Sequence, residues 1–465
     1  MKKQVFTKSY VENGTYVIGF LILLVIQLLR EVPFGTEHYL NIRLAGLLSL
    51  FDPLSFGGRF AAYSWGTPLV LSPAPEFLAL VLPIILGVLS IFVFRNIVKE
   101  FVEEKALVNI ASIFFIFSPI YIYLFSSANT IFMPFFISLS IFYLFVKNKW
   151  KKLNYVLIAV MPLFSISFSI FLLLILGLYS FAWKKDRKKD FLRLFYVGAF
   201  VSLIYFSVIV YNTGLPNLFE INKEVNFSLF QELLFDFGSN LGVAIFTFVL
   251  AIMGFIYLWS KKYENLFVFF SVLILFVLSY FFQTALIFFN IFLIFFAALG
   301  FLSLIKRRWS SQYFRRVTLL LILIGVVFSG ASQEIQIIEA LPNTEIMEAV
   351  DLLSQHNEVV ILSDYSRGVW INYAGHKNVI DENYLFVSDA EERYQDIENV
   401  FYLRNLEDSE EILEKYNVSY IWVDDWYRDE IWDYETEGLL FVAQYTKDFN
   451  KIYEEKGVDI WRIEG

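Results

Sequence analysis

A short polar stretch between two apolar runs holds the side chains best suited to chemistry. Within residues 35–43, Glu37 and Asn41 are four residues apart, so on a helix they share one face. A carboxylate in that place could bind a divalent cation through its oxygens or accept a proton from an acceptor group. The same spacing also fits a solvated acidic cap on an interfacial helix, and from spacing alone both interpretations stay open.

Two arginines in the same part of the chain could neutralise a phosphate. Arg43 ends the polar stretch, and Arg59 ends the turn-rich run 51–59. A guanidinium matches phosphate oxygens with two parallel hydrogen bonds. The alternative is that each arginine meets lipid headgroups at the membrane surface.

The elements that must position these residues are mostly membrane helices. Of the 465 residues, 57% are apolar and 19% are aromatic, which is the composition of a membrane protein and not of a soluble enzyme. Apolar runs of about 18 residues or more can cross a bilayer. We expect such spans at residues 15–30, 76–94, 107–125, 129–147, 192–212, 239–259, 264–281, 284–305 and 316–333.

The stretch 153–183 is apolar but longer, with Pro162 and several serines near its middle. Basic clusters at both of its ends favour the same side of the membrane, so we predict two short or re-entrant helices here. With this pair, the membrane domain has about eleven segments over residues 1–333. Its long outer loops are residues 31–75 and 213–238.

Basic residues set the expected orientation. Residues 1–333 hold 15 acids and 27 bases, whereas residues 334–465 hold 31 acids and 10 bases. A cytoplasmic N-terminus places 23 of those 27 bases on the cytoplasmic side, as the positive-inside rule requires, and an odd number of segments then places the acidic tail outside. We therefore expect a multi-pass protein of the cell membrane with an extracytoplasmic C-terminal domain. An acidic domain repels phosphate backbones, so no nucleic-acid partner is expected.

Residues 334–465 alternate between helical and strand patterns, which predicts a soluble α/β domain. The absence of cysteine excludes disulfides, thiol catalysis and cysteine-ligated zinc, and the three histidines leave little for a histidine metal cage. The chain also lacks a glycine-rich phosphate loop in this domain. We expect strands at 359–362 and 419–423, helices at 343–355 and 408–417, and two short strands within 449–463.

The polar stretch resembles a motif of the GT-C membrane glycosyltransferases, and among them of the catalytic subunit of oligosaccharyltransferase. That family carries a pattern like Asp-x-Tyr-Phe-Asn-x-Arg in its first outer loop, and residues 37–43 read Glu-His-Tyr-Leu-Asn-Ile-Arg. The resemblance implies a multi-span helical membrane domain followed by an external soluble domain. It also implies that Glu37 stands in the place of the motif's aspartate.

A second match lies in the C-terminal domain. Family members carry Trp-Trp-Asp-Tyr-Gly after a strand and, later, a segment ending in Asp-x-Asn. Here Gly368 and the pair Asp381 and Asn383 stand in the corresponding places, while Ser366 replaces the motif's aspartate. In oligosaccharyltransferase this motif recognises the hydroxyl residue of the acceptor sequon, so its replacement argues against transfer to Asn-x-Ser/Thr. The predicted substrate-binding residues are Asn41, Arg43, Arg59, Gly368 and Asp381.

The resemblance implies further carboxylates. The family's second outer loop carries an acidic pair, but residues 126–130 of this chain contain no carboxylate. A later outer loop of the family carries a functional glutamate, for which Glu232 is the best positional match and Glu224 the next. We therefore predict Glu37 and Glu232 as catalytic carboxylates and as ligands of a divalent cation, Mg²⁺ or Mn²⁺. An amphipathic interfacial helix whose acids face water is the alternative for this loop.

The leading hypothesis is an integral-membrane glycosyltransferase that moves a sugar from a polyprenyl-phosphate-linked donor to a protein or glycan at the outer membrane face. The competing hypothesis is a non-catalytic GT-C-like protein that acts in binding or assembly. A lipid-linked polysaccharide polymerase or flippase is a third option, and it would need more polar residues within the spans.

Overall fold

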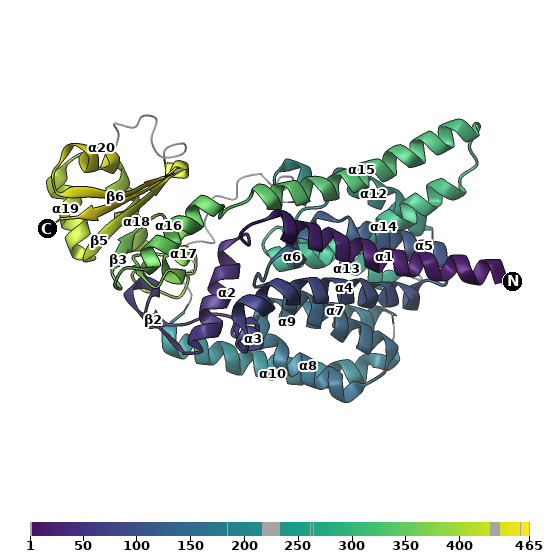
Figure 1. The fold of residues 1–465 in the computed structure, drawn as a ribbon. Coiled ribbons are helices and arrows are strands. Elements are labelled where there is room, and N and C mark those ends of the chain that lie inside the picture. The colour runs from purple at the N-terminus through teal and green to yellow at the C-terminus, as the bar shows by residue number, and fades with distance from the viewer. Residues whose placement is uncertain are drawn as a thin grey trace.

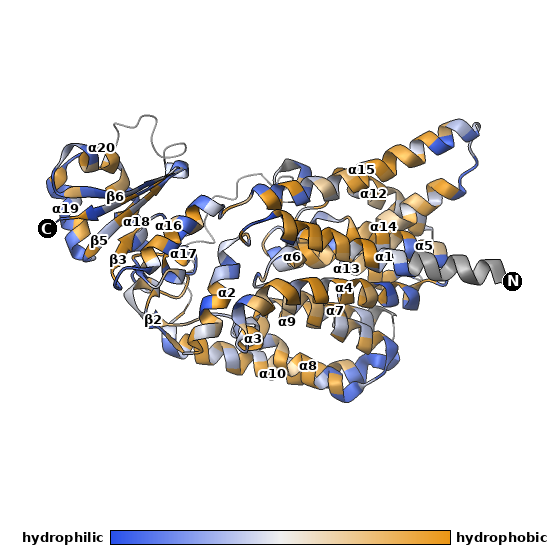
Figure 2. Ribbon diagram, viewed as in Figure 1, coloured by the Kyte–Doolittle hydropathy of each residue, from blue (hydrophilic) through white to orange (hydrophobic). Residues whose placement is uncertain are grey.

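The computed structural model describes residues 2–183, 185–215, 233–260, 262–263, 265–427, 438–455 and 457–464. A helical bundle and a smaller domain built on a sheet lie at opposite ends of the molecule, with the N-terminus at the far end of the bundle and the C-terminus in the sheet domain (Figure 1). Apolar residues dominate the bundle helices, while hydrophilic residues concentrate in the sheet domain and at the remote end of the bundle (Figure 2).

The bundle is formed by helices that follow the predicted spans closely. Four of the described helical stretches are long and apolar enough to cross a membrane: Pro75–Phe101, Lys188–Thr213, Gln283–Lys306 and Gln312–Ser354. A fifth candidate is the bent pair Lys105–Ile116 and Pro119–Ser126. The other apolar helical stretches have 10–17 residues, among them Asn13–Leu29 of α1, so the predicted count of eleven segments stays a prediction. The bundle helices are α1 (Lys2–Leu29), α4 (Pro75–Phe101), α5 (Lys105–Ile116), α6 (Pro119–Ser126), α7 (Phe132–Lys147), α8 (Lys151–Phe164), α9 (Ile166–Leu178), α10 (Lys188–Thr213), α12 (Ile245–Trp259), α13 (Leu266–Ser279), α14 (Gln283–Lys306) and α15 (Gln312–Glu339).

Two breaks in the bundle have local causes. The expected span 107–125 is wrong as a single helix, because α5 and α6 meet at an angle of 55°. Ser118 precedes a proline, which disfavours helical backbone, and its hydroxyl caps α6 by accepting from the backbone N–H of Tyr121 at 3.3 Å. The predicted division of 153–183 into two helices is confirmed, since α8 and α9 meet at the extended residue Ser165, whose hydroxyl caps α9.

Glycines bring α12 and α14 into backbone contact. A Cβ on Gly254 would lie 1.9 Å from the carbonyl oxygen of Phe296, and one on Gly300 would lie 2.1 Å from that of Leu250. Small residues permit this close approach between membrane helices. As a result α14 is held in the middle of the bundle, where 83% of its apolar window is buried.

The sheet domain has five strands in the order β4-β3-β5-β7-β6. The strands β4, β3 and β5 are parallel, and β7 pairs antiparallel with β5 and β6. All the expected strands and helices of this domain are confirmed to within a few residues. Its elements are α16 (Thr344–Ser354), β3 (Val360–Leu362), η6 (Tyr365–Arg367), α17 (Gly368–Tyr373), β4 (Lys377–Asn378), α18 (Ala390–Tyr402), α19 (Leu406–Lys415), β5 (Val418–Asp424), α20 (Gly438–Tyr445), β6 (Phe449–Glu455) and β7 (Val458–Ile463).

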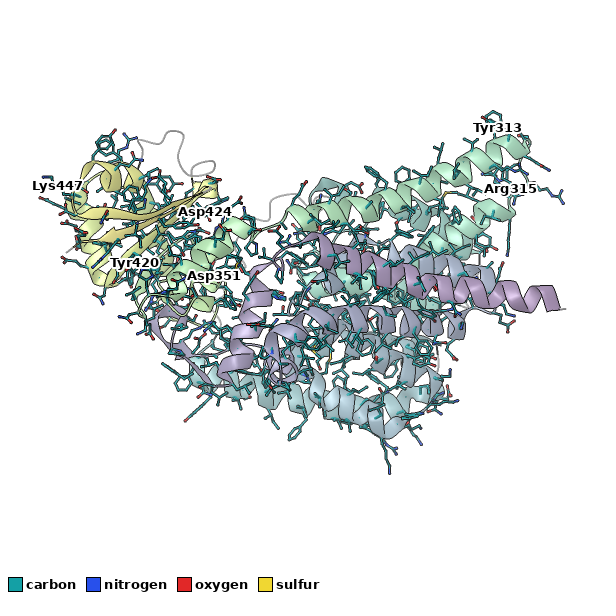
Figure 3. The ribbon with its side chains drawn as sticks, in the orientation of Figure 1. Tyr313, Arg315, Asp351, Tyr420, Asp424 and Lys447 are labelled. Atoms are coloured by element: carbon teal, nitrogen blue, oxygen red, sulfur yellow. The ribbon has the colours of Figure 1, made fainter. Side chains whose placement is uncertain are left out.

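The basic and acidic parts of the chain occupy opposite ends. Arg315 lies at the tip of the bundle, whereas Asp351 and Asp424 lie in the sheet domain (Figure 3). Helix α15 connects the two ends and continues past the predicted domain boundary at residue 333 to Glu339. This arrangement agrees with the charge separation seen in the sequence.

The first outer loop packs into the sheet domain. It forms α2 (Thr36–Leu47), β1 (Phe51–Asp52), η1 (Ser55–Gly57), β2 (Arg59–Phe60) and α3 (Gly66–Leu71). Five of its apolar side chains are buried in the same core cluster as the side chains of the sheet domain. They are Tyr39, Leu40, Leu44, Phe56 and Tyr63.

Arg30, which directly follows α1, links the start of the first outer loop to the end of α15 through hydrogen bonds. Its Nε donates to the carbonyl oxygen of Val32 at 2.8 Å, and its Nη2 donates to that of Pro342 at 2.8 Å. Its Nη1 donates to the carbonyls of Ile337 and Ile338 at the C-terminal end of α15. The carbonyl oxygen of Ile337 also accepts from the N–H of Ala340 at 3.3 Å. The C-terminal end of a helix carries partial negative charge, so a cation is stabilising there.

We expect the fragment 334–465 to lack a cooperative fold on its own. Burial of each of the five loop side chains stabilises by about 1.5–3 kcal/mol, and their sum is comparable with the whole stability of a small domain. Near-UV circular dichroism during thermal unfolding checks this. A fragment in which residues 31–75 are fused to 334–465 should regain a cooperative transition, and a sharp transition of the unfused fragment would contradict the prediction.

Candidate functional site

Glu37 lies in the first turn of α2, which begins after Gly35 with its positive φ of 86°. A carboxylate is favourable at this end of a helix. Its Oε2 accepts a hydrogen bond from the backbone N–H of Thr130 at 2.8 Å. Burial raises the pKa of the Glu37 carboxyl above its ordinary value, against the hydrogen bonds from Thr130. A raised pKa makes this carboxylate a better proton acceptor near neutral pH.

The segment 126–130 holds α2 through its backbone. Asn41 Nδ2 donates to the carbonyl oxygen of Ala128 at 2.8 Å, and the N–H of Ala128 donates to His38 Nδ1 at 3.2 Å. Burial, together with the positive charge of Arg30, lowers the pKa of His38 to about 3, so this ring is a neutral acceptor. The amide of Asn41, predicted to bind substrate, therefore also fixes the helix that carries Glu37.

Two cavities meet at Glu37. The interdomain cavity has a volume of about 230 Å³ and lies between the first outer loop and the sheet domain. The bundle-end cavity has a volume of about 670 Å³ and lies at the adjoining ends of the bundle helices. Glu37 lines both cavities. The interdomain cavity is lined by Glu37, Leu40, Asn41, Leu44, Arg59, Ala62, Tyr63, Ser64, Thr130, Glu382, Asn383, Leu385 and Phe386. The bundle-end cavity is lined by Glu37, Tyr123, Ile131, Gly238, Ser239, Asn240, Leu241, Ser279, Tyr280, Phe281, Phe282, Gln283 and Leu286.

Arg59 presents a guanidinium to the interdomain cavity. Its Cζ lies 5.1 Å from the ring centroids of Phe56 and of Tyr63. Its Nε and Nη1 are buried and have no hydrogen-bond partner among the described residues. Buried donors without partners are costly, so a site with two of them favours an anionic ligand.

Arg43 occupies a different position from the one predicted. Both of its Nη atoms donate to the two carboxylate oxygens of Asp52, each at 2.7 Å. Arg43 is not among the described residues that line the two cavities. The geometry therefore favours a supporting role for Arg43 in the loop and leaves the predicted phosphate contact to Arg59. The reason is the hairpin of β1 and β2, which brings Asp52 against the helix that carries Arg43.

The pair of Arg43 and Asp52 predicts a large effect on stability. Burial alone would raise the pKa of the Asp52 carboxyl, but the Arg43 fork and the hydroxyl of Tyr63 outweigh it and lower that pKa. Asp52→Asn leaves a buried guanidinium without its partner and should cost about 3–5 kcal/mol of stability. The pKa of Asp52 is lower in the folded protein than in the unfolded chain, where it is about 3.9. The Asp52 carboxylate therefore stabilises the fold fully above a pH of about 3.9, and this stabilisation is lost as the pH falls from there through the folded pKa. Thermal unfolding of the detergent-solubilised protein should show a steeper acid loss for the wild type than for Asp52→Asn. Equal pH dependence of the two would contradict this prediction.

Gly368 and Asp381 are buried packing residues. A Cβ on Gly368 would lie 2.3 Å from the carbonyl oxygen of Ile380, so only glycine fits this contact. Asp381 is 1% exposed and accepts from the hydroxyl of Ser55 at 2.5 Å and from the N–H of Asn383 at 2.7 Å. Neither residue is among those that line the interdomain cavity or the bundle-end cavity, so their contact with a substrate stays a prediction.

The Ser366 hydroxyl is hydrogen-bonded to two neighbouring residues of the protein. It donates to the carboxylate of Asp364 and accepts from Arg367 Nη1 at 2.8 Å. Arg367 in turn bonds Asp424 at the end of β5 through its Nε, at 2.7 Å. Through these hydrogen bonds, the segment around Ser366 is held against the end of β5.

Glu382 is a cavity residue that the sequence reasoning missed. It occupies the variable place of the Asp-x-Asn match, and nothing in the sequence shows that this place faces the cavity. Part of its surface is open, yet desolvation by the cavity wall raises the pKa of Glu382 to about 7. The nearby carboxylates of Glu37 and Asp381 add to this effect, while Thr36 and Arg367 oppose it.

The donor set for a divalent cation is incomplete in the described part of the chain. No group of three or more His, Asp or Glu side chains there is arranged to hold a metal ion. Glu232, the predicted second ligand, lies outside the described residues. Because Mg²⁺ and Mn²⁺ want about six oxygens, the described residues alone do not fit the ion.

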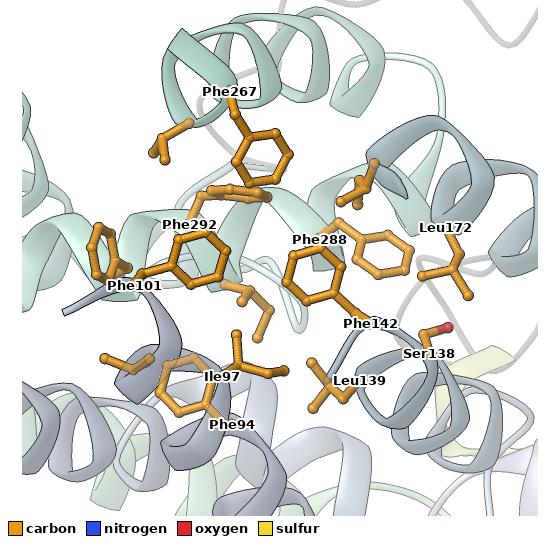
Figure 4. Close-up of a pocket in the computed structure, with 15 residues that line it drawn as sticks. Phe94, Ile97, Phe101, Ser138, Leu139, Phe142, Leu172, Phe267, Phe288 and Phe292 are labelled. Atoms are coloured by element: carbon orange, nitrogen blue, oxygen red, sulfur yellow. The ribbon is translucent and has the colours of Figure 1, made fainter. Parts of the chain in front are cut away.

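A third cavity, of about 80 Å³, lies inside the bundle (Figure 4). It is almost wholly apolar, with rings of Phe94, Phe142 and Phe288 pointing into it and Ser138 as its polar residue. Helix α14 lines this cavity from Phe288 onward, and two residues earlier the same helix lines the bundle-end cavity with Leu286. A polar and an apolar cavity therefore follow each other along one helix.

The chain has the fold of solved archaeal oligosaccharyltransferase structures, which confirms the predicted resemblance at the level of fold. The apo crystal structure of the Archaeoglobus fulgidus oligosaccharyltransferase matches with a TM-score of 0.63 at 14% identity, over 90% of this chain and 70% of that chain. The same enzyme tethered to an acceptor peptide containing the NVT sequon gives a TM-score of 0.66 at 15% identity, over 98% and 74% of the two chains. The archaeal oligosaccharyltransferase AglB with an inhibitory peptide and a dolichol-phosphate gives 0.64 at 14% identity, over 97% and 74%.

No protein-family model matches the chain, and no curated protein matches it in sequence. The similarity at 14–15% identity is therefore one of fold.

Proposed function

We propose that the protein is an integral-membrane glycosyltransferase that moves a sugar from a polyprenyl-phosphate-linked donor to a protein or glycan acceptor. One observation carries the proposal: Glu37 lies where the interdomain cavity and the bundle-end cavity meet. A transferase needs its proton acceptor between two substrates, and a carboxylate with a raised pKa suits that task.

The chemistry is an inverting displacement at the anomeric carbon. The nucleophilic atom of the acceptor bonds to that carbon while the bond from the carbon to the phosphate oxygen breaks, and the electron pair leaves with the phosphate. Glu37 takes the proton that the nucleophile loses. Arg59 offsets the charge that develops on the departing phosphate, as its two unpaired N–H groups favour.

The apolar cavity supports a lipid-linked donor. A polyprenyl phosphate has a polar head and a long apolar tail, and α14 passes from the polar bundle-end cavity to the apolar one within a turn. One structure of similar fold is a complex with dolichol-phosphate. The membrane bilayer is the medium from which such a donor enters, so the site belongs at the membrane surface.

Cation binding by Glu37 and Glu232 remains part of the proposal. A structure of the Archaeoglobus fulgidus enzyme contains Zn and sulfate, which supports a metal in proteins of this fold. A bound cation would compensate phosphate charge. Electron paramagnetic resonance of added Mn²⁺ tests binding without turnover, and loss of the bound signal in Glu37→Gln or Glu232→Gln would assign the ligands.

A non-catalytic role in binding or assembly is favoured by a specific observation. The segment 126–130 contributes backbone contacts and no carboxylate, and the Ser366 hydroxyl is occupied within the protein. In that case the cavities would bind a ligand without turning it over.

The deciding experiment uses the full chain in lipid nanodiscs. The probes are a labelled polyprenyl-phosphate hexose and a labelled polyprenyl-pyrophosphate N-acetylhexosamine, with asparagine-, serine- and threonine-containing peptides and a disaccharide as acceptors. Transfer of label, with release of polyprenyl phosphate or pyrophosphate, is the expected result. Binding of a donor with no turnover in any combination would favour the non-catalytic role.

A further inference from the structure

Hydrogen bonds fix residues 381–383 so that Glu382 and Asn383 line the interdomain cavity. Asp381 is anchored to the first outer loop by Ser55 and turns the chain by accepting from the N–H of Asn383. Between them, Glu382 lines the cavity, and its Oε2 accepts from the hydroxyl of Thr36 at 2.5 Å. Thr36 immediately precedes Glu37 in α2, so the bond ties the tip of this segment to the helix that carries the proposed base.

Glu382 differs from the supporting carboxylates of the protein. Asp52, Asp381 and Asp424 are each no more than 3% exposed and are bonded to groups of the protein. Glu382 keeps part of its side chain open in a cavity that Glu37 and Arg59 also line. An accessible carboxylate in such a place can accept hydrogen bonds from a ligand.

The chain lacks a carboxylate where the family resemblance led us to expect an acidic pair. From the segment 126–130, the backbone N–H of Thr130 donates to Glu37 Oε2 at 2.8 Å. The sheet domain instead presents Glu382 to the same cavity. The second carboxylate of this site thus comes from a different part of the chain than the motif predicts.

We propose that Glu382 binds the acceptor and, with Glu37, orients its nucleophilic group; this inference rests on the proposed function. The acceptor group then offers two hydrogen-bond donors, one to each carboxylate. During transfer the nucleophile gives its proton to Glu37 and bonds to the anomeric carbon, while the electron pair of the broken bond leaves with the phosphate. Glu382 keeps its hydrogen bond throughout and gains no proton.

The test measures acceptor and donor binding separately in nanodiscs, with the labelled donors and acceptors named above. Glu382→Gln should raise the KM for the acceptor by about 10- to 100-fold, the effect of losing a hydrogen bond to a charged group, and leave donor binding unchanged. Glu382→Asp should restore part of the loss, and Thr36→Val should give an intermediate KM because Glu382 loses its tether. Glu391→Gln is the control, an exposed carboxylate in the first turn of α18.

Each outcome decides. An unchanged acceptor KM in Glu382→Gln, with an active wild type, would overturn the role of Glu382 and leave the proposed function standing. A loss that Glu382→Asp does not relieve, accompanied by a lower unfolding temperature and weaker donor binding, would show a purely structural residue. A wild type that turns over neither donor would overturn the proposed function itself and this role with it.

Discussion

Glu37→Gln should lower the rate of sugar transfer by roughly 10²- to 10⁴-fold, the range that a positioned general base contributes. The amide keeps the size of the side chain and can still accept the hydrogen bond from the N–H of Thr130. It cannot take the proton of the nucleophile. The measurement is single-turnover transfer of label in nanodiscs, so that donor binding and chemistry are read separately.

The matched control for Glu37 is Glu398→Gln, which removes an exposed carboxylate of α18 that lines neither cavity. This control should transfer at the wild-type rate. A Glu37→Gln protein that binds donor and transfers within a few-fold of the wild type would remove Glu37 from the chemistry. The position between the two cavities would then need another explanation.

The fold was predictable because its signals are local. Apolar runs and the flanking bases located the bundle helices, and short apolar runs located β3 and β5. The break between α5 and α6 also had a local signal, the Ser118-Pro119 pair, which the length of the apolar run outweighed. Local patterns therefore fix where elements begin and end.

The site was predictable only in part, because contacts between distant residues have no local signal. Glu37 and Asn41 share a helix face, so their spacing placed both at one cavity. Arg43 lies on the same helix, but the hairpin after it delivers Asp52 to its guanidinium, and no spacing rule contains that pairing. Glu382 approaches Glu37 only because the loop and the sheet domain share a core.

Arg59→Gln should reduce transfer by about 10²-fold, because a positioned cation that meets developing charge contributes on that order. The Arg59 guanidinium lines the interdomain cavity with two buried N–H groups unpaired among the described residues. An anion that satisfies them gains charge-assisted hydrogen bonds. Arg59→Lys should rescue only part of the loss, since an ammonium keeps the charge but lacks the planar fork.

The split between kcat and KM decides which phosphate state Arg59 recognises. A fall in kcat with an unchanged donor KM means that the contact forms as charge develops on the leaving phosphate, whereas a raised donor KM with the same kcat means that it also binds the resting donor. Arg462→Gln, which removes an exposed arginine of β7, is the control and should leave both values unchanged. If Arg59→Gln also leaves kcat and the donor KM unchanged, the Arg59 guanidinium only packs against Phe56 and Tyr63 and does not contact the donor.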